Sequence, residues 1–368
     1  MGTPSVRRTD VLGPEAEGDL LALATANSQL PIPAFANATA AIPRLQFIQP
    51  DRSSLPPLSR YAALQMPDGT RRVVGNSEAT RGCKHLCRHC PIVPVYRGAF
   101  RAVPVGVVLD DIRAQVAAGA EHISFGDPDF FNGPAHARRV LEQFARDCRG
   151  VTFDVTIKIE HLLNHADLLP LLRDSGCLFV TSAVESVDDE VLARLRKGHT
   201  RTDFIRAVEA CRQAGIMLSP TFVPFTPWTT LEGYADLLEQ LAALDLIESV
   251  APIQLAIRLL VTADSALFEL PDFGQRLQPF DGESLTWPWR HADPRVDALQ
   301  EDVMRLVGSL QQATRRETFD RIVAMTRDRT GMSQPVNAPE PAATRHQGPT
   351  PPYLTEAWYC CAEPVWAI

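Results

Sequence analysis

The strongest constraint on the fold is a regular alternation of two sequence patterns between residues 73 and 260. Short apolar, β-branched segments alternate with longer segments whose apolar residues recur at helical spacings, as Phe204, Val208 and Cys211 do. Several helical segments end in a glycine just before the next apolar run, where a helix C-cap is expected: Gly119, Gly176 and Gly215. Repeated strand–helix units predict a parallel sheet with right-handed crossovers.

The apolar segments predict six strands, near residues 73–80, 121–130, 151–159, 178–185, 217–225 and 252–260. Six β/α units are two short of a closed eight-fold barrel. The predicted fold class is therefore α/β, a partial (β/α)6 TIM-like barrel. Such a barrel has an open side, and its chemistry lies at the C-terminal ends of the strands.

The chain divides into five predicted segments: an N-terminal extension (1–70), the barrel (71–265), a C-terminal helical region (266–332), a proline-rich linker (333–352) and a tail (353–368). Helical patterns outside the barrel cover residues 18–26, 294–314 and 317–327. Six prolines predict that residues 333–352 form an extended linker or a disordered tether. The tail is rich in aromatic residues, which a disordered segment would not need, so we expect it to dock.

Composition narrows the class of partner and the compartment. The net charge of −8 argues against a broad nucleic-acid or anionic-membrane surface, because such surfaces need a cationic face. There is no run of about 18 apolar residues to predict a transmembrane helix. The first residues lack the apolar core of a secretory signal. We therefore expect a cytoplasmic protein without nucleic-acid or membrane partners.

Three cysteines, Cys83, Cys87 and Cys90, have the spacing C-x3-C-x2-C. Clustered thiols in a cytosolic chain favour metal binding over a disulfide framework. Three thiolates on one short loop can bind three irons of a [4Fe–4S] cubane, which leaves the fourth iron open for a small chelating molecule. The alternative is a structural zinc site, for which His85 and His89 are the nearby candidates for a fourth ligand.

This cysteine spacing just after a first strand, followed by repeated β/α units, resembles the radical S-adenosylmethionine (radical SAM) superfamily. The resemblance covers residues 73–260 and implies a [4Fe–4S] cluster whose open iron is chelated by S-adenosylmethionine. It further implies reductive cleavage of this cofactor to methionine and a 5′-deoxyadenosyl radical, with an electron from an external donor such as flavodoxin or ferredoxin. The chain departs from the family pattern at His89, where an aromatic residue usually precedes the last cysteine.

The resemblance also implies cofactor contacts at the ends of the second and third strands. Gly126, Asp127 and Asp129 stand where the family has a Gly-Gly-Glu-like segment that meets the amino group of the cofactor. Glycine allows close backbone approach, and a carboxylate could pair with an ammonium; a simple strand-ending turn is the alternative. Lys158 and Glu160 are charged residues on an apolar strand, so we expect them to bind the cofactor or each other.

Two later strands add further candidates. Ser182 and Glu185 resemble residues of the family's fourth strand that contact ribose. Gln254 and Arg258 have the alternation that would turn both side chains inward. Arg258 could then bind a carboxylate of cofactor or substrate.

The tail contains the adjacent pair Cys360–Cys361 within Cys-Cys-Ala-Glu-Pro. Adjacent cysteines form only a strained disulfide, so free thiols or a redox-labile pair are expected, with chance as the alternative. This ending resembles a branch of radical SAM proteins with the same tail, some of which carry selenocysteine at the second position. The resemblance implies that Cys360 and Cys361 are catalytic, as hydrogen-atom donors, as reductants or as ligands of a thiophilic atom.

Together these features predict a radical SAM enzyme that starts radical chemistry on a small-molecule substrate, assisted by the cysteine pair. Two alternatives stay open. The aminocarboxypropyl group of S-adenosylmethionine could be transferred to an arsenic or selenium acceptor, since the same ligands would serve. The chain could instead be a cluster-containing sensor of redox state or metalloids.

Overall fold

The computed structural model describes residues 45–310, 312–331 and 351–355. Every described helix and strand lies in one compact unit, Gln49–Ile368. The expected helix over residues 18–26, the linker up to residue 350 and the pair Cys360–Cys361 lie outside the described residues. Among the described helices, none combines the length and the apolar character needed to cross a membrane.

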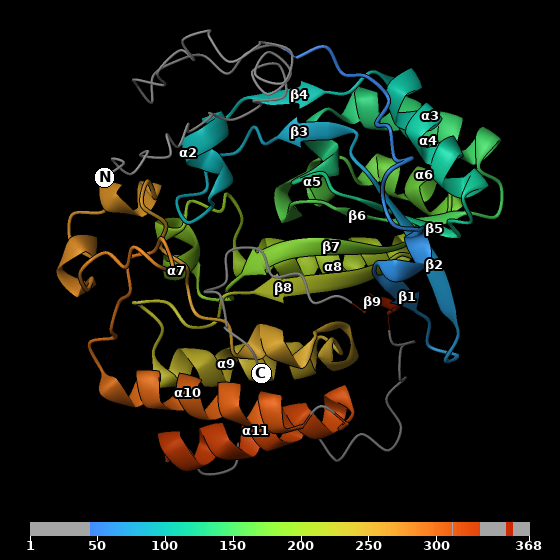
Figure 1. Cartoon of the computed structure of the whole chain (residues 1–368). Coiled ribbons are helices and arrows are strands. Elements are labelled where there is room, and N and C mark those ends of the chain that lie inside the picture. Colours follow the sequence, from blue (N-terminus) through green and yellow to red (C-terminus); the bar gives the residue numbers. More distant parts are fainter. Residues whose placement is uncertain (1–44, 311, 332–350, 356–368) are drawn as a thin grey trace, which may run out of the picture. The chain divides into compact units, whose positions relative to one another are not determined.

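A seven-stranded sheet forms the centre of this unit, in the order β8-β7-β6-β5-β2-β1-β9. Five neighbouring strands run parallel: β2 (Arg71–Ser77), β5 (His122–Phe125), β6 (Thr152–Thr156), β7 (Cys177–Glu185) and β8 (Met217–Phe222). The sheet is curled into an open half-barrel (Figure 1). The predicted partial barrel is thereby confirmed.

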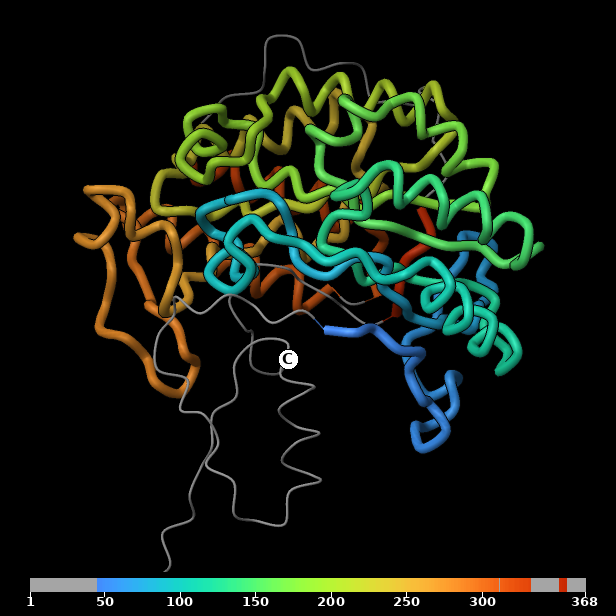
Figure 2. The backbone as a smooth tube through the Cα atoms, turned by 90° about the horizontal axis from the view of Figure 1, so that it is seen from above, coloured from blue at the N-terminus to red at the C-terminus, as the bar shows by residue number. Residues whose placement is uncertain are grey.

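The connecting helices pack against the strands that they join, with α3 against β2, α6 against β7 and α8 against β8. Figure 2 shows the chain running from teal through green to yellow-green around the outer side of the unit. Helices α9, α10 and α11 pack beside one another (Figure 1). The helices are α3 (Val105–Ala117), α4 (Pro134–Asp147), α5 (Ile159–Asn164), α6 (Leu169–Asp174), α7 (Asp189–Arg194), α8 (Arg201–Ala214), α9 (Leu231–Ala243), α10 (Pro294–Ser309) and α11 (Arg315–Thr330).

Helix α8 shows how local sequence sets an element. Thr200 and Asp203 form a capping box that satisfies two backbone N–H groups at the first turn. Gly215 ends the helix in the left-handed region, with a φ of 72°. The predicted stripe, which includes Phe204 and Val208, is buried. Its apolar face therefore packs inward as the spacing indicates.

The prediction of a strand at residues 252–260 is wrong. Pro252–Leu255 is a 3-10 helix, because proline cannot donate to a strand ladder but fits the first turn of a helix. One parallel bridge, between Phe225 and Arg258, remains of the sixth strand in the described part of the chain. The helix expected at residues 294–314 is also shorter, and Thr314 instead caps α11.

Two short strands extend the sheet beyond β2. β1 (Ala63–Gln65) pairs antiparallel with β2, and β9 (Tyr353–Leu354) pairs antiparallel with β1. Leu354 packs on a small core that includes Leu64. Thr355 continues the pairing, since its N–H donates to the carbonyl of Ala63 over 2.9 Å. The described beginning of the tail is therefore attached to the edge of the sheet.

Candidate functional site

The three cysteines lie on a loop that leaves a small two-stranded sheet and enters a short helix. These elements are β3 (Thr80–Gly82), α2 (Ile92–Tyr96) and β4 (Phe100–Ala102). The loop is tight, since the N–H of Cys90 donates to the carbonyl of Cys87 over 3.1 Å. Gly82 precedes it with a φ of 81°, and a Cβ at this position would meet the Tyr96 ring at 2.5 Å. Glycine therefore allows the chain to leave β3 in this direction.

The surroundings of the cysteines favour metal binding. Cys87 is buried, while Cys83 and Cys90 are partly exposed. Burial raises the pKa of Cys83 to about 12, and nearby Asp129, Cys90 and Cys87 act in the same direction. Thiolates packed together with little water need a compensating positive charge, which cluster iron supplies. The donor set thus fits a [4Fe–4S] cluster held by three protein ligands.

Asp127 follows β5 and fixes the strand that leads into the cysteine loop. Its carboxylate accepts hydrogen bonds from the N–H groups of Ala79 (2.8 Å) and Thr80 (2.5 Å) and from the Thr80 hydroxyl (2.6 Å). Burial raises the pKa of Asp127 to about 7, against these hydrogen bonds, which lower it. The N–H of the adjacent Gly126 donates to Ser77. Contacts of Gly126 and Asp127 with the cofactor stay predictions.

Glu185 connects the end of β7 to the cysteine loop. Its buried carboxylate lies 3.1 Å from Nε2 of His89 and accepts a hydrogen bond of 3.2 Å from Lys197. Burial alone would raise the pKa of Glu185, but the Lys197 ammonium and His89 outweigh it and lower the pKa to about 2. Sequence reasoning identified Glu185 but missed this pairing. The ribose contact stays a prediction.

Ser182 lies on the same strand and is fully buried. Its hydroxyl has no hydrogen-bond partner among the described residues. A buried hydroxyl without a partner is unfavourable. This oxygen is therefore a polar group that a bound molecule could satisfy, as the predicted ribose contact requires.

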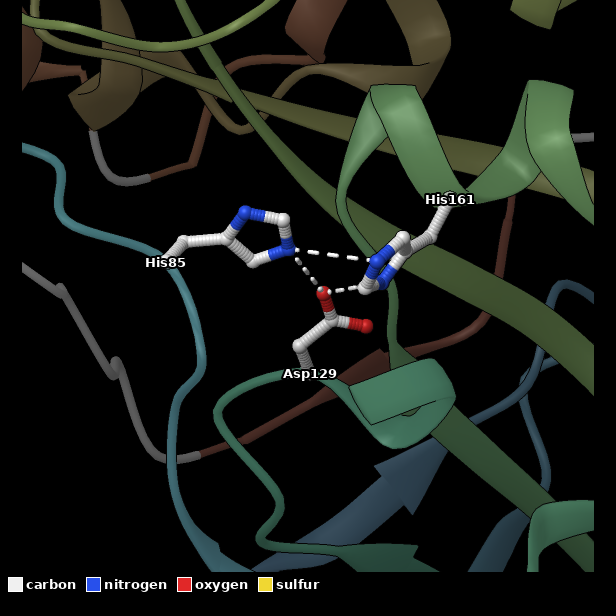
Figure 3. Close-up of side chains that lie close together, drawn as sticks. All are labelled: His85, Asp129 and His161. Carbon is white, nitrogen blue, oxygen red and sulfur yellow. Dashed lines mark hydrogen bonds and ion pairs between the residues drawn. The ribbon is translucent and has the colours of Figure 1, made fainter. Parts of the chain in front are cut away.

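Asp129, Lys158 and Glu160 meet two histidines beside the cysteine loop. Oδ2 of Asp129 lies 2.6 Å from Nδ1 of His161 and 3.5 Å from Nε2 of His85 (Figure 3). Lys158 is within 3.2 Å of both His85 Nδ1 and Glu160 Oε2. Burial lowers the pKa of His85, although Asp129 opposes this. Lys158 and Glu160 thus pair with each other, and their contact with the cofactor stays a prediction, as does that of Asp129.

The structure separates Gln254 from Arg258, which corrects the expectation that both point inward from one strand. The guanidinium of Arg258 donates to Asp297 over 2.7 Å and stacks 3.6 Å above the Trp289 ring. It lines a small cavity of about 270 Å³. Gln254 lines a different, larger cavity. The separation follows from the 3-10 helix at Pro252–Leu255, and carboxylate binding by Arg258 stays a prediction.

The larger cavity has a volume of about 1560 Å³ and is bordered by all five parallel strands. Polar side chains from these strands line it: Asn76, Ser124, Asp154, Thr156, Thr181 and Thr221. Asp127, Pro352 and residues 353–355 of the tail line it as well. The cavity therefore joins the strand ends near the cysteine loop to the beginning of the tail.

Inside this cavity, Asp154 is a residue that sequence reasoning missed. Its carboxylate lies 2.9 Å from Nε2 of His122 and accepts a hydrogen bond of 3.2 Å from Ser124. The sequence feature that could have indicated this site is the presence of polar residues within the apolar segments 121–130 and 151–159. Alternation within a strand indicates which side chains share a face, but the pairing between β5 and β6 decides which of them meet.

The fold and the cysteine loop define the class of protein. Residues 77–241 match the family model of the radical SAM superfamily. This stretch contains the cysteine loop and the parallel strands β5 to β8. Residues 77–241 therefore form a radical SAM domain, and domains of this superfamily use a [4Fe–4S] cluster and S-adenosylmethionine.

Curated proteins are similar over part of the chain. The ribosomal protein uS12 methylthiotransferase RimO of Parabacteroides distasonis is 25% identical over 166 residues, which are 43% of this chain and 38% of that protein. The tRNA-2-methylthio-N(6)-dimethylallyladenosine synthase of Desulfosudis oleivorans is 29% identical over 197 residues, 51% of this chain and 40% of that protein. The chain thus spans less than half the length of these relatives.

A solved structure is similar in fold. The cobalamin-dependent S-adenosylmethionine radical enzyme OxsB, with aqua-cobalamin bound, superposes with a TM-score of 0.54 at 15% sequence identity. The superposition covers 69% of this chain and 46% of OxsB. At this identity the similarity concerns the fold.

Proposed function

We propose that this protein cleaves S-adenosylmethionine reductively and starts radical chemistry on a small molecule in the large cavity, assisted by Cys360 and Cys361. The observation that carries the proposal is the position of Asp127, which lines the cavity and binds the strand leading into the cysteine loop. When bound, the cluster and cofactor supply the reducing electron and the 5′-deoxyadenosyl radical. An external donor such as flavodoxin or ferredoxin replenishes the electron.

The lining of the cavity supports a polar substrate that carries an ammonium or several hydroxyl groups. Arg72 can only donate, and it donates to the Thr152 hydroxyl over 3.0 Å. The same hydroxyl lies 2.8 Å from Nδ1 of His122, and Nε2 of His122 lies 2.9 Å from Oδ1 of Asp154. Among the described residues, no lysine or arginine pairs with Asp154.

The attachment of β9 supports a role for the cysteine pair in the same reaction. Thr355 borders the cavity, and Cys360 follows five residues later. A chain spans at most about 3.3–3.6 Å per residue, so covalent geometry keeps Cys360 within roughly 20 Å of Thr355. A thiol in that range can reach a radical formed in the cavity and give it a hydrogen atom.

The main test uses protein reconstituted with iron and sulfide, reduced without oxygen and incubated with S-adenosylmethionine. Mass spectrometry should detect 5′-deoxyadenosine and methionine. Cys83→Ala, Cys87→Ala and Cys90→Ala should each lose the cluster absorbance near about 400 nm and the product. Cys211→Ala is the control, since Cys211 is buried in α8, and should keep both. Methylthioadenosine as the product would instead favour aminocarboxypropyl transfer, and a colourless zinc protein would refute the proposal.

A second test addresses the cysteine pair without a known substrate. Thiol hydrogens exchange with solvent, so turnover in D2O should place deuterium in 5′-deoxyadenosine when Cys360 or Cys361 donates the hydrogen atom. The donor sulfur is left as a thiyl radical. Cys361→Ala and Cys360→Ala should lower the deuterium content, whereas Cys211→Ala should not. Equal deuterium content in all variants would exclude the pair as the donor.

A further inference from the structure

Three side chains beside the cysteine loop converge on one point: His85, Asp129 and His161 (Figure 3). One possible ligand atom from each lies within 4.8 Å of the other two. The residues come from the cysteine loop, the segment after β5 and helix α5. Within the described ranges, this is the one such group of three among His, Cys, Asp and Glu side chains. The folded chain therefore gathers potential ligands that are far apart in sequence.

Hydrogen bonds do not satisfy all the polar atoms of this group. Oδ2 of Asp129 and Nδ1 of His161 are buried and have no aligned hydrogen bond, although they are 2.6 Å apart. Their side chains are 2% and 3% exposed. The other oxygen of Asp129 accepts the N–H of Phe131 over 3.0 Å, which holds Oδ2 toward the histidines. Buried polar atoms without aligned partners are unfavourable, and a cation bound to Oδ2 would satisfy that oxygen.

The spacing suits a small divalent cation. With Nε2 as the ligand atom of both histidines, Nε2 of His85 lies 3.2 Å from Nε2 of His161 and 3.5 Å from Oδ2 of Asp129. Nδ1 of His161 is not a ligand, because it lies only 2.6 Å from Oδ2. Ligands that bind a metal at 2.0–2.2 Å in a tetrahedral shell lie about 3.3–3.6 Å from one another. Two imidazoles and one carboxylate leave coordination positions open, and this ligand set suits iron and its neighbours among the transition metals.

The surroundings also supply an outer partner for one ligand. If Nε2 of His85 binds a metal, Nδ1 carries the ring proton and needs an acceptor. Oε2 of Glu160 lies 3.7 Å from this Nδ1 and also pairs with Lys158. A small rotation that turns Lys158 fully toward Glu160 would leave the carboxylate to accept the His85 proton. Metal binding thus reverses the direction of the present hydrogen bond at Nδ1.

We infer that His85, Asp129 and His161 bind one divalent first-row transition metal ion, such as Fe²⁺ or Zn²⁺, beside and separate from the cysteine-bound cluster. The open positions accept water or a donor atom of a bound small molecule. None of the three cysteines is needed as a ligand. The inference therefore does not depend on the proposed function, and a failure to cleave S-adenosylmethionine would leave it standing.

The test uses Co²⁺ as the probe, because cobalt occupies sites of histidine and carboxylate ligands and is paramagnetic. Reconstituted protein is freed of loosely bound metal and kept oxidised, so that the [4Fe–4S] cluster is diamagnetic. Equilibrium dialysis should give one Co²⁺ per chain, and the cluster absorbance should not change. Pulsed EPR of the bound Co²⁺ should detect coupling to two imidazole nitrogens.

Variants locate the site. Asp129→Asn keeps an oxygen for the N–H of Phe131 but removes the charge, and His161→Gln removes an imidazole. Each should weaken Co²⁺ binding by more than about 100-fold, since changes to outer partners alone cost about 10–100-fold. His136→Gln is the matched control: His136 is buried, bonds the carbonyl of Ala79 and lies outside the group. It should bind Co²⁺ as the wild type does.

Three results would overturn the inference. They are less than one Co²⁺ per chain at millimolar Co²⁺, coupling to fewer than two imidazole nitrogens, or wild-type affinity in Asp129→Asn and His161→Gln. If these variants also lose the cluster, the nitrogen count from the wild-type protein decides. Histidines that only form a hydrogen-bonded group with Asp129 would give the first result.

Discussion

Gly82 controls how the cysteine loop leaves β3. Its φ of 81° is unfavourable for other residues, and an added Cβ would lie 2.5 Å from the Tyr96 ring. Gly82→Ala should lower the free energy of unfolding by about 1–2 kcal/mol for the backbone and about 1–3 kcal/mol for overpacking. Gly69→Ala is a matched control, since Gly69 has a φ of 84° but open space around it. Gly69→Ala should lower the free energy of unfolding only by the backbone contribution, about 1–2 kcal/mol.

Urea unfolding and cluster content together check this prediction. Gly82→Ala should also reduce the iron bound after reconstitution, because the direction of the loop positions Cys83. Gly69→Ala should bind iron normally. Equal effects of the two substitutions on stability would show that the contact with Tyr96 does not matter.

The buried pair of Glu185 and Lys197 predicts a dependence of stability on pH. The folded-state pKa of Glu185 is lowered from its usual value of 4.5 to about 2. An acid with a lowered pKa stabilises the fold above its unfolded pKa, and this contribution disappears as the pH falls. The wild type should therefore lose stability between about pH 4.5 and pH 2, measured by urea unfolding at a series of pH values.

Removing one partner of this pair tests its importance. Glu185→Gln removes the buried carboxylate that Lys197 bonds over 3.2 Å, which should cost about 3–5 kcal/mol at neutral pH. The double variant Glu185→Gln/Lys197→Met also removes the buried ammonium and should recover part of this loss. A single variant as stable as the wild type, with an unchanged pH profile, would contradict the assignment.

Among the secondary-structure elements, β9 attaches the described beginning of the tail to the edge of the sheet beside the cavity. Leu354 pairs with Leu64 and packs on the core at that edge. Leu354→Asp should detach β9, since it places a charge on an apolar surface. Hydrogen exchange should then become faster at Thr355, whose N–H donates to Ala63.

Thr355→Ser is the control for this experiment, because serine keeps both the backbone N–H and the hydroxyl that accepts from Ala63. It should keep the protection. Leu354→Asp should also lower deuterium transfer into 5′-deoxyadenosine in D2O if the attachment of β9 brings Cys360 and Cys361 near the radical. Unchanged exchange at Thr355 would show that β9 is not held by Leu354.

Helices and strands could be predicted from the sequence where the hydrophobic periodicity and the capping residues indicate the same element. Where these two signals are weak or conflict, the prediction failed. Helix α8 has a capping box, an apolar stripe and a terminal glycine, and its predicted buried stripe and glycine end are confirmed. Residues 252–260 are apolar like a strand, but the proline at their start favours a 3-10 turn. β1 and β9 pair although they are far apart in the sequence. β1 has three residues and β9 has two, which is too short for a hydrophobic pattern to predict the contact.

Across the whole molecule, the site is built from residues whose proximity depends on tertiary structure. The cysteine spacing is local, so the sequence alone could propose Cys83, Cys87 and Cys90 as cluster ligands. His85, Asp129 and His161 come together only when the loop, β5 and α5 are in place. The same holds for His122 with Asp154, which pair across neighbouring strands. Residue types at strand ends therefore indicated the region, while the partners of each side chain required the structure.

The separation between the cysteine loop and the half-barrel leads to a prediction about metal removal. β3 and β4 form a sheet of their own, whereas the core of the parallel sheet contains fully buried residues such as Ile123, Phe153 and Val180. Oxidative removal of the cluster should therefore loosen the loop without unfolding the barrel, because local openings follow the local density of contacts. Hydrogen exchange should become faster over residues 83–99 and stay slow in β5 to β8. A Cys83→Ala variant without a cluster should show the fast pattern before treatment and no further change after it. Loss of protection throughout the parallel strands would mean instead that the cluster is required for the whole fold, as metals are in small metal-dependent domains.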